Sequence, residues 1–155
     1  NLAKEINFIT VRLFNVYGPR LNGRVVDNFI KKAIKGEDLI IHNNGEQTRA
    51  FTYIDDIIEG FNLLLENKSC LNSSFNIGNT KETSIIDLAK TINNKFGNKL
   101  NIVYQGQDEA FGNGYEDIPL RVPNINRINE LTSWLPKTSL ESGIDKYLKY
   151  MNENE

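Results

Sequence analysis

The sequence predicts an α/β fold with parallel strand pairing, and three observations lead to this class. Segments rich in β-branched and aromatic residues alternate with segments whose apolar residues recur at helical spacing. Glycine and asparagine mark turns between them. The chain has 155 residues, 39% hydrophobic and 25% charged, which is enough for a folded domain with a core.

The first half of the chain is expected to alternate strands and helices. The predicted elements are a strand at 7–14, a helix at 24–35, short strands at 39–41 and 51–53, and a helix at 55–66. The first strand is so apolar that it needs sheet neighbours on both sides, and the short strands that follow are expected not to supply both. Asp55 is predicted to cap the second helix. The apolar face of that helix comprises Ile57, Ile58, Phe61, Leu64 and Leu65.

The second half continues the alternation and contains one long irregular segment. The predicted elements are a strand at 74–77, a helix that starts after Ser84, a strand at 100–104, a loop at 105–123, and helices at 125–132 and after residue 138. Ser84 with Asp87 has the spacing of a helix start, and Thr138 with Glu141 has the spacing of a capping box.

Composition excludes several function classes. A net charge of -2 and a pI near 5.5 argue against nonspecific binding to nucleic acid, which relies on a basic surface. No apolar run approaches the roughly 18 residues of a membrane span, so a cytoplasmic protein without a membrane partner is expected. The single cysteine, Cys70, cannot form an internal disulfide, and no zinc-ligand pattern surrounds it, so no metal is expected.

Three segments combine ligand-binding residue types with strand ends, turns or helix starts. They are Arg12-Leu-Phe-Asn-Val-Tyr-Gly-Pro-Arg20, Gly45-Glu-Gln-Thr-Arg-Ala-Phe-Thr-Tyr-Ile-Asp-Asp56 and Gly112-Asn-Gly-Tyr-Glu-Asp-Ile-Pro-Leu-Arg-Val-Pro-Asn124. The first places an asparagine and an arginine at the end of a strand, where open α/β sheets bind ligands. Taken singly, each segment also suits a structural role: a turn, a hairpin with a capped helix, and a surface loop.

Together, in this order and spacing, the segments resemble the extended short-chain dehydrogenase/reductase family from about Phe8 to Tyr150. These NAD(P)-dependent enzymes epimerise, dehydrate or decarboxylate nucleotide sugars. The Gly-x-Gly-Tyr-x-Asp run with the following Arg-x-Pro is most similar to UDP-glucuronate decarboxylases. The resemblance implies the C-terminal part of a Rossmann-type parallel sheet plus a small mixed α/β substrate-binding domain.

The resemblance also implies site residues. The substrate-binding residues would be Asn15, Arg24, Arg49, Tyr115 and Arg121. Asn15 would bond the sugar or its diphosphate, while Arg24 and Arg49 would grip the nucleotide and diphosphate with charged guanidinium forks. Tyr115 and Arg121 would close over the sugar. Arg121 could also take a catalytic role by pairing with a uronate carboxylate or assisting protonation after carbon dioxide leaves. Phe14 would lie near the nicotinamide of the cofactor.

The sequence departs from the family in what it lacks. Neither a Gly-x-x-Gly-x-x-Gly loop nor a Tyr-x-x-x-Lys pair occurs in it, and in the family both precede the Arg-x-Phe-Asn segment. Residues 1–155 are therefore expected to be the C-terminal, nucleotide-sugar-binding half of an enzyme, inactive and without NAD when alone. The full-length enzyme is expected to use NAD and to form a homodimer.

The activity itself stays open at this level. The leading hypothesis is a UDP-sugar decarboxylase or a UDP-glucose 4-epimerase. The alternatives are an NDP-glucose 4,6-dehydratase and a noncatalytic nucleotide-sugar-binding or assembly module. Single residues cannot separate decarboxylase from epimerase, because the deciding acid would lie in the other half.

Overall fold

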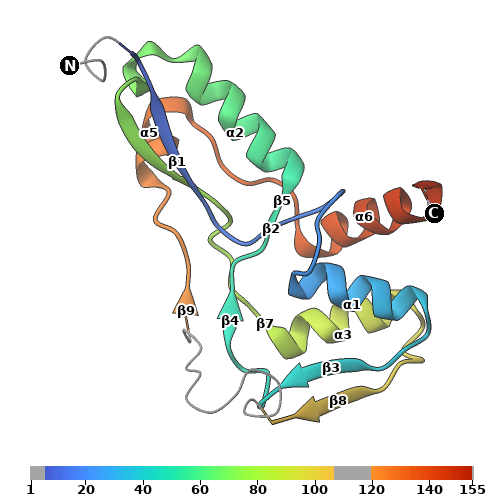
Figure 1. The fold of residues 1–155 in the computed structure, drawn as a ribbon. Coiled ribbons are helices and arrows are strands. Elements are labelled where there is room, and N and C mark those ends of the chain that lie inside the picture. Colours follow the sequence, from blue (N-terminus) through green and yellow to red (C-terminus); the bar gives the residue numbers. More distant parts are fainter. Residues whose placement is uncertain (1–5, 107–119, 155) are drawn as a thin grey trace.

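A computed structural model describes residues 6–106 and 120–154 and confirms the α/β class. Figure 1 shows the order and arrangement of the elements. The strands are β1 (Ile9–Leu13), β2 (Val16–Tyr17), β3 (Leu39–His42), β4 (Thr48–Arg49), β5 (Thr52–Tyr53), β6 (Ser73–Ile77), β7 (Thr83–Ser84), β8 (Ile102–Gln105) and β9 (Leu120–Arg121). The helices are α1 (Val25–Ile34), α2 (Ile54–Glu66), the short 3-10 helix η2 (Lys68–Cys70), α3 (Ile85–Lys95), α5 (Asn126–Thr132) and α6 (Leu140–Asn154).

Parallel pairing dominates the sheets. β1 pairs with β6, β2 with β5, and β3 with β8, each in parallel. β4 lies between β7, which is antiparallel to it, and β9, which is parallel. Parallel partners need a long crossover, and between β1 and β6 it consists of residues 14–72, which include α1 and α2. Strands from distant parts of the sequence therefore become neighbours.

The chain packs around two hydrophobic cores. One core joins α1, α3, β3 and α6, with residues such as Phe29, Leu88 and Ile144. The other joins α2, β6, α5 and Trp134. Figure 1 shows β1, α2 and α5 in one region and α1, α3, β3 and β8 in another, with β4, β7 and β9 between them. This division places short polar strands between two separately packed units.

The start of α3 follows the predicted pattern. Ser84 is the N-cap, and its hydroxyl oxygen accepts the backbone N–H of Asp87 at 3.1 Å. The hydroxyl in turn donates to the Asp87 carboxylate at 2.7 Å. On the apolar face of this helix, Leu88, Ala89 and Ile92 are fully buried.

The start of α2 differs from the prediction. Its N-cap is Tyr53, not Asp55, and no side chain makes a capping hydrogen bond there. Asp55 lies in the first turn and accepts from Lys146 Nζ at 3.0 Å. The next residue, Asp56, is buried and accepts both the N–H and the hydroxyl of Thr138 at 3.0 Å. Acidic residues suit the first turn of a helix, and here they also connect α2 to α6.

α6 begins one residue later than predicted, because the residue expected to cap it is bound to Asp56 instead. The sequence pointed to Thr138 as the cap, but its hydroxyl is bound to Asp56. Ser139 takes the capping role, because its hydroxyl oxygen accepts the N–H of Ser142 at 3.1 Å. The predicted loop at 105–123 is also interrupted, since β8 extends to Gln105 and β9 forms at Leu120–Arg121; residues 107–119 lie outside the described part.

β1 has β6 as its one partner among the described strands, and Leu13 is 49% exposed, which agrees with the expectation that the strands of this chain do not supply a second neighbour. One burial prediction is wrong. On α2, Ile58 and Leu65 are 51% and 72% exposed, because the helix buries only the stripe that faces β6 and Trp134. Cys70 is fully buried in η2. Among the described helices, none has the length and apolar character to cross a membrane.

Candidate functional site

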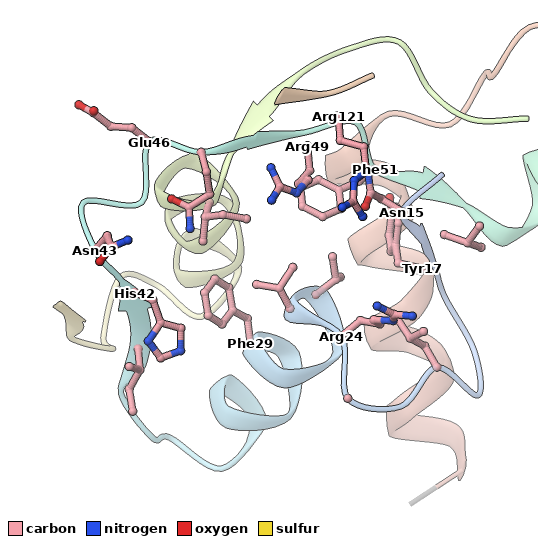
Figure 2. Close-up of a pocket in the computed structure, with 18 of the residues that line it drawn as sticks. Asn15, Tyr17, Arg24, Phe29, His42, Asn43, Glu46, Arg49, Phe51 and Arg121 are labelled. Carbon is pink, nitrogen blue, oxygen red and sulfur yellow. The ribbon is translucent and has the colours of Figure 1, made fainter. Parts of the chain in front are cut away.

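A single pocket collects most of the predicted site residues. It has a volume of about 940 Å³ and is bounded by the end of β1, β2, the start of α1, the end of β3, β4 and β9. Figure 2 shows Arg24, Arg49 and Arg121 toward one end of the pocket, with His42 and Asn43 toward the other. Asn15 lies beside the arginine end.

Asn15 forms the bend between β1 and β2. Its φ is 40°, a left-handed conformation that asparagine tolerates better than most residues. Its side-chain N–H₂ donates to the carbonyl of Ala50 at 3.2 Å, and its backbone carbonyl accepts the N–H of Thr52 at 3.1 Å. These bonds hold the pocket wall near Asn15 against the segment that follows Arg49.

Arg24 stands at the beginning of α1. It is the N-cap, in extended conformation, and it makes no side-chain capping bond. Gly23 precedes it with a φ of +73°, which makes the turn that glycine accommodates at no steric cost. Arg24 therefore presents its guanidinium at the same pocket wall as the positive end of the α1 dipole.

Arg49 and Arg121 face each other on neighbouring strands. In the parallel pair of β4 and β9 they are register partners, so their side chains project from the same face. Arg49 Nη1 also donates to the carbonyl of Thr48 at 2.7 Å, which orients the guanidinium. Like charges directly opposite on a sheet are unfavourable by themselves. An anion bound between them would offset that repulsion.

The sequence reasoning missed His42, the one histidine of the chain. Burial along β3 alternates, so that Leu39 and Ile41 enter the core while Ile40 and His42 line the pocket. The signal was available, because His42 ends a strand just before a turn, the same rule that selected Asn15. Phe29 and Phe51, which are also part of the first hydrophobic core, line the pocket as well and were not predicted as site residues.

Tyr17 forms a pocket wall and keeps its proton. Its hydroxyl donates to the carbonyl of Leu140 at 3.4 Å, and its ring packs edge-on against Tyr53 with centroids 5.4 Å apart. Burial, reinforced by the nearby Tyr53, Asp56 and Glu141, raises the pKa of Tyr17 above its ordinary value. The described part of the chain shows no group of three His, Cys, Asp or Glu side chains placed to hold a metal ion.

One predicted residue lies elsewhere, and another falls outside the described part of the chain. Phe14 does not line the pocket; it packs against Gly78, where an added Cβ would come within 2.8 Å of the Phe14 Cβ. Its placement near a nicotinamide stays a prediction. Tyr115 lies outside the described residues.

Solved structures of sugar-nucleotide enzymes share this fold. The UDP-glucose 4-epimerase of Thermotoga maritima, solved with UDP-glucose, matches with a TM-score of 0.84 and 27% identity over 97% of this chain and 47% of that one. The UDP-glucuronic acid 4-epimerase of Bacillus cereus, solved with UDP-glucuronic acid and NAD, matches with a TM-score of 0.83 and 27% identity over 95% and 46%. These are Rossmann-type enzymes, as the sequence predicted for this chain.

Sequence relatives agree with the structural ones. UDP-glucuronic acid decarboxylase 1 of Xenopus tropicalis is 36% identical over 145 residues, which cover 92% of this chain and 32% of that protein. The chain thus spans about a third of this relative and just under half of the two solved epimerases. The family model that describes NAD dependent epimerases and dehydratases matches residues 1–78, half of the chain. The chain belongs to the NAD dependent epimerase/dehydratase family.

Proposed function

We propose that this chain is the nucleotide-sugar-binding half of an NAD-dependent enzyme, either a UDP-sugar decarboxylase or a 4-epimerase. The pocket would hold the nucleoside diphosphate, with Arg24 and Arg49 on the phosphates. The sugar would extend toward Asn15 and Arg121. The cited relatives act on UDP-sugars and match over nearly the whole of this chain, which supports the proposal.

The observation that carries the proposal is the convergence of three guanidinium groups. Arg49 and Arg121 are in register on adjacent strands, and Arg24 lines the same pocket from the start of α1. The chain as a whole has a net charge of -2, so the positive charge of this cluster is opposite in sign to the net charge of the chain. Arginine forks match phosphate oxygens with two parallel hydrogen bonds each. The volume of about 940 Å³ also lies at the upper end of the range of about 300–1,000 Å³ for small-molecule sites, which suits a large ligand.

The residues of this chain do not fit NAD by themselves. The sequence contains no Gly-x-x-Gly-x-x-Gly loop for the pyrophosphate and no Tyr-x-x-x-Lys pair. We therefore place no step of the redox chemistry on these residues. We propose that a separate dinucleotide-binding half supplies NAD, and that the 155-residue chain alone binds UDP but turns over no sugar.

The activity of the full-length protein can be assigned by its products. With UDP-glucuronic acid and NAD, a decarboxylase releases carbon dioxide, whereas a 4-epimerase forms UDP-galacturonic acid. Conversion of dTDP-glucose to a 4-keto-6-deoxy sugar would instead assign a 4,6-dehydratase. A protein that binds UDP-sugars and yields none of these products would be a noncatalytic binding module.

The binding site is tested by calorimetric titration of the 155-residue chain with UDP. Arg49→Ala should weaken UDP binding about ten- to hundredfold, because a hydrogen bond to a charged group contributes about 1.5–3 kcal/mol. Arg12→Ala is the matched control, since Arg12 is exposed on β1 and does not line the pocket. Equal affinities for the two variants would refute the site. Unfolding of Arg49→Ala with affinity intact in the folded fraction would instead make Arg49 structural.

A further inference from the structure

The C-terminal helix α6 contacts both walls of the pocket without lining it. No residue of α6 is among those that border the described pocket. Gly143 and Tyr147 lie one helical turn apart, so they share a face of α6, and both are buried. Through these two residues, the helix reaches the β2 wall and the α1 wall.

The contact with the β2 wall is made at Gly143. A Cβ at this position would lie within 1.9 Å of the Tyr17 hydroxyl oxygen, so α6 approaches Tyr17 as closely as only glycine permits. The Tyr17 hydroxyl also donates to the carbonyl of Leu140 in the same helix. Tyr17 is two residues from Asn15, and both line the pocket.

The contact with the α1 wall is made through a buried carboxylate. Asp27 is 1% exposed, yet its oxygens accept three donors: the N–H of Gly23 at 2.9 Å, Lys31 Nζ at 3.1 Å and the hydroxyl of Tyr147 at 2.9 Å. Lys31 also donates to the side chain of Asn22 at 3.1 Å. A buried carboxylate is stable only when its lone pairs are satisfied in this way. The turn that precedes Arg24 is thus fixed by this one group.

Tyr147 is the one long-range donor in this network. It lies 120 residues from Asp27 in the sequence, whereas Gly23 and Lys31 are each four residues away. Its hydroxyl is 2.9 Å from Asp27 but 3.5 Å from the carbonyl of Leu21, so the bond to the charged acceptor dominates. Burial, and then the bond to Asp27, raise the pKa of Tyr147, which keeps it a donor.

We propose that Asp27 and Tyr147 are positioning residues for the nucleotide site. They hold the turn at residues 21–24 so that Arg24 faces Arg49 and Arg121 across the pocket. The inference rests on the proposed function, because it assumes that these arginines bind a diphosphate. It adds a role for α6, which no pattern in the motifs assigns.

The test uses the 155-residue chain, UDP and a variant that removes one atom. Tyr147→Phe keeps the buried ring and loses the bond to Asp27. We expect UDP binding to weaken about three- to tenfold, while circular dichroism shows the fold retained at the assay temperature. The control is Tyr150→Phe, the same change on the same helix, where the hydroxyl makes no hydrogen bond with the described residues. We expect that control to leave UDP affinity unchanged.

A double-mutant cycle separates positioning from general stability. If Tyr147 acts through Arg24, then Tyr147→Phe should change UDP affinity little in an Arg24→Ala background. Hydrogen exchange without ligand should also quicken at residues 21–26 in Tyr147→Phe and not in Tyr150→Phe. A lower unfolding midpoint with unchanged UDP affinity, or effects that simply add in the double variant, would overturn the inference.

The failure of the inference and that of the proposed function give different results. If the wild-type chain does not bind UDP at all, the proposed function is refuted and the inference falls with it. If Arg24→Ala weakens UDP binding but Tyr147→Phe does not, the site stands and the positioning role alone is refuted. Weakening by Tyr147→Phe that disappears in the Arg24→Ala background supports both.

Discussion

Gly143→Ala should destabilise the chain, although the same substitution stabilises most helices. In an exposed helix, replacing glycine by alanine gains about 1 kcal/mol of helix propensity. At Gly143 the new Cβ would lie 1.9 Å from the hydroxyl oxygen and 2.7 Å from Cζ of Tyr17. Normal heavy-atom contacts are about 3.5–4.0 Å, so the two groups must separate by about 1.5 Å or more. The ring cannot easily yield, because Tyr17 is 2% exposed and packed against Tyr53.

The expected magnitude follows from these two opposing effects. Overpacking a core by a methyl group costs about 1–3 kcal/mol, against a gain in propensity of about 1 kcal/mol. We expect the free energy of unfolding to fall by up to about 2 kcal/mol, or the Tm by up to roughly 8 °C in a chain of this length. UDP affinity should fall as well, since Tyr17 forms a wall of the pocket.

Urea denaturation followed by far-UV circular dichroism measures this effect, because α6 itself contributes to the helical signal. The one tryptophan, Trp134, is buried in the other core and would report the unfolding of that core. Ser142→Ala is the control, because Ser142 is exposed on the neighbouring position of the same helix. A raised midpoint for Gly143→Ala would show that α6 can move away from Tyr17 without loss, and would refute the reasoning.

Four further predictions address other parts of the chain. In the full-length enzyme, Arg121→Ala should lower turnover more than UDP affinity, because its expected partner is the reacting sugar; equal loss of affinity for UDP and UDP-sugar would place it on the nucleotide. Asp56→Ala should lower the free energy of unfolding by about 1–3 kcal/mol in urea titrations, since it leaves the N–H and hydroxyl of Thr138 without their acceptor. Burial raises the pKa of the Cys70 thiol, so Ellman's reagent should react only with the unfolded chain, and rapid labelling in native buffer would contradict its burial. A hydrogen bond from its own backbone N–H is the main cause that lowers the pKa of Glu141 below its ordinary value. The contribution of Glu141 to stability is therefore complete at neutral pH and is lost as the pH falls through the pKa of Glu141 in the folded chain. Glu141→Gln should reduce the fall in Tm at acid pH, and an unchanged profile of Tm against pH would contradict this.

Local patterns predicted most of the elements because each depends on a few neighbouring residues. The cap at Ser84, the helix predicted at 24–35 and the strand predicted at 74–77 all formed close to the expected bounds. The predictions failed where a side chain had a second, distant partner. Asp55 and Thr138 have the residue types of caps, but their oxygens bind Lys146 and Asp56 instead. Periodicity cannot reveal such competition, because it contains no information about contacts between segments.

Motif spacing predicted only part of the site. Motif spacing selected Asn15, Arg24, Arg49 and Arg121, and the structure brings all four to one pocket, although their roles remain proposals. His42 was passed over because it belongs to no motif, even though it also ends a strand.

The α/β class, the longer helices and strands and the family were predictable from composition, local periodicity and motif spacing, whereas the two-residue strands β2, β4, β7 and β9 were not predicted. The register pairing of Arg49 with Arg121, 72 residues apart in the sequence, could be seen only in the folded chain. The same holds for the hydrogen bond from Tyr147 to Asp27. Strand register and buried hydrogen bonds depend on how distant segments pack, and only the packed chain satisfies the charges and donors that each segment leaves unpaired.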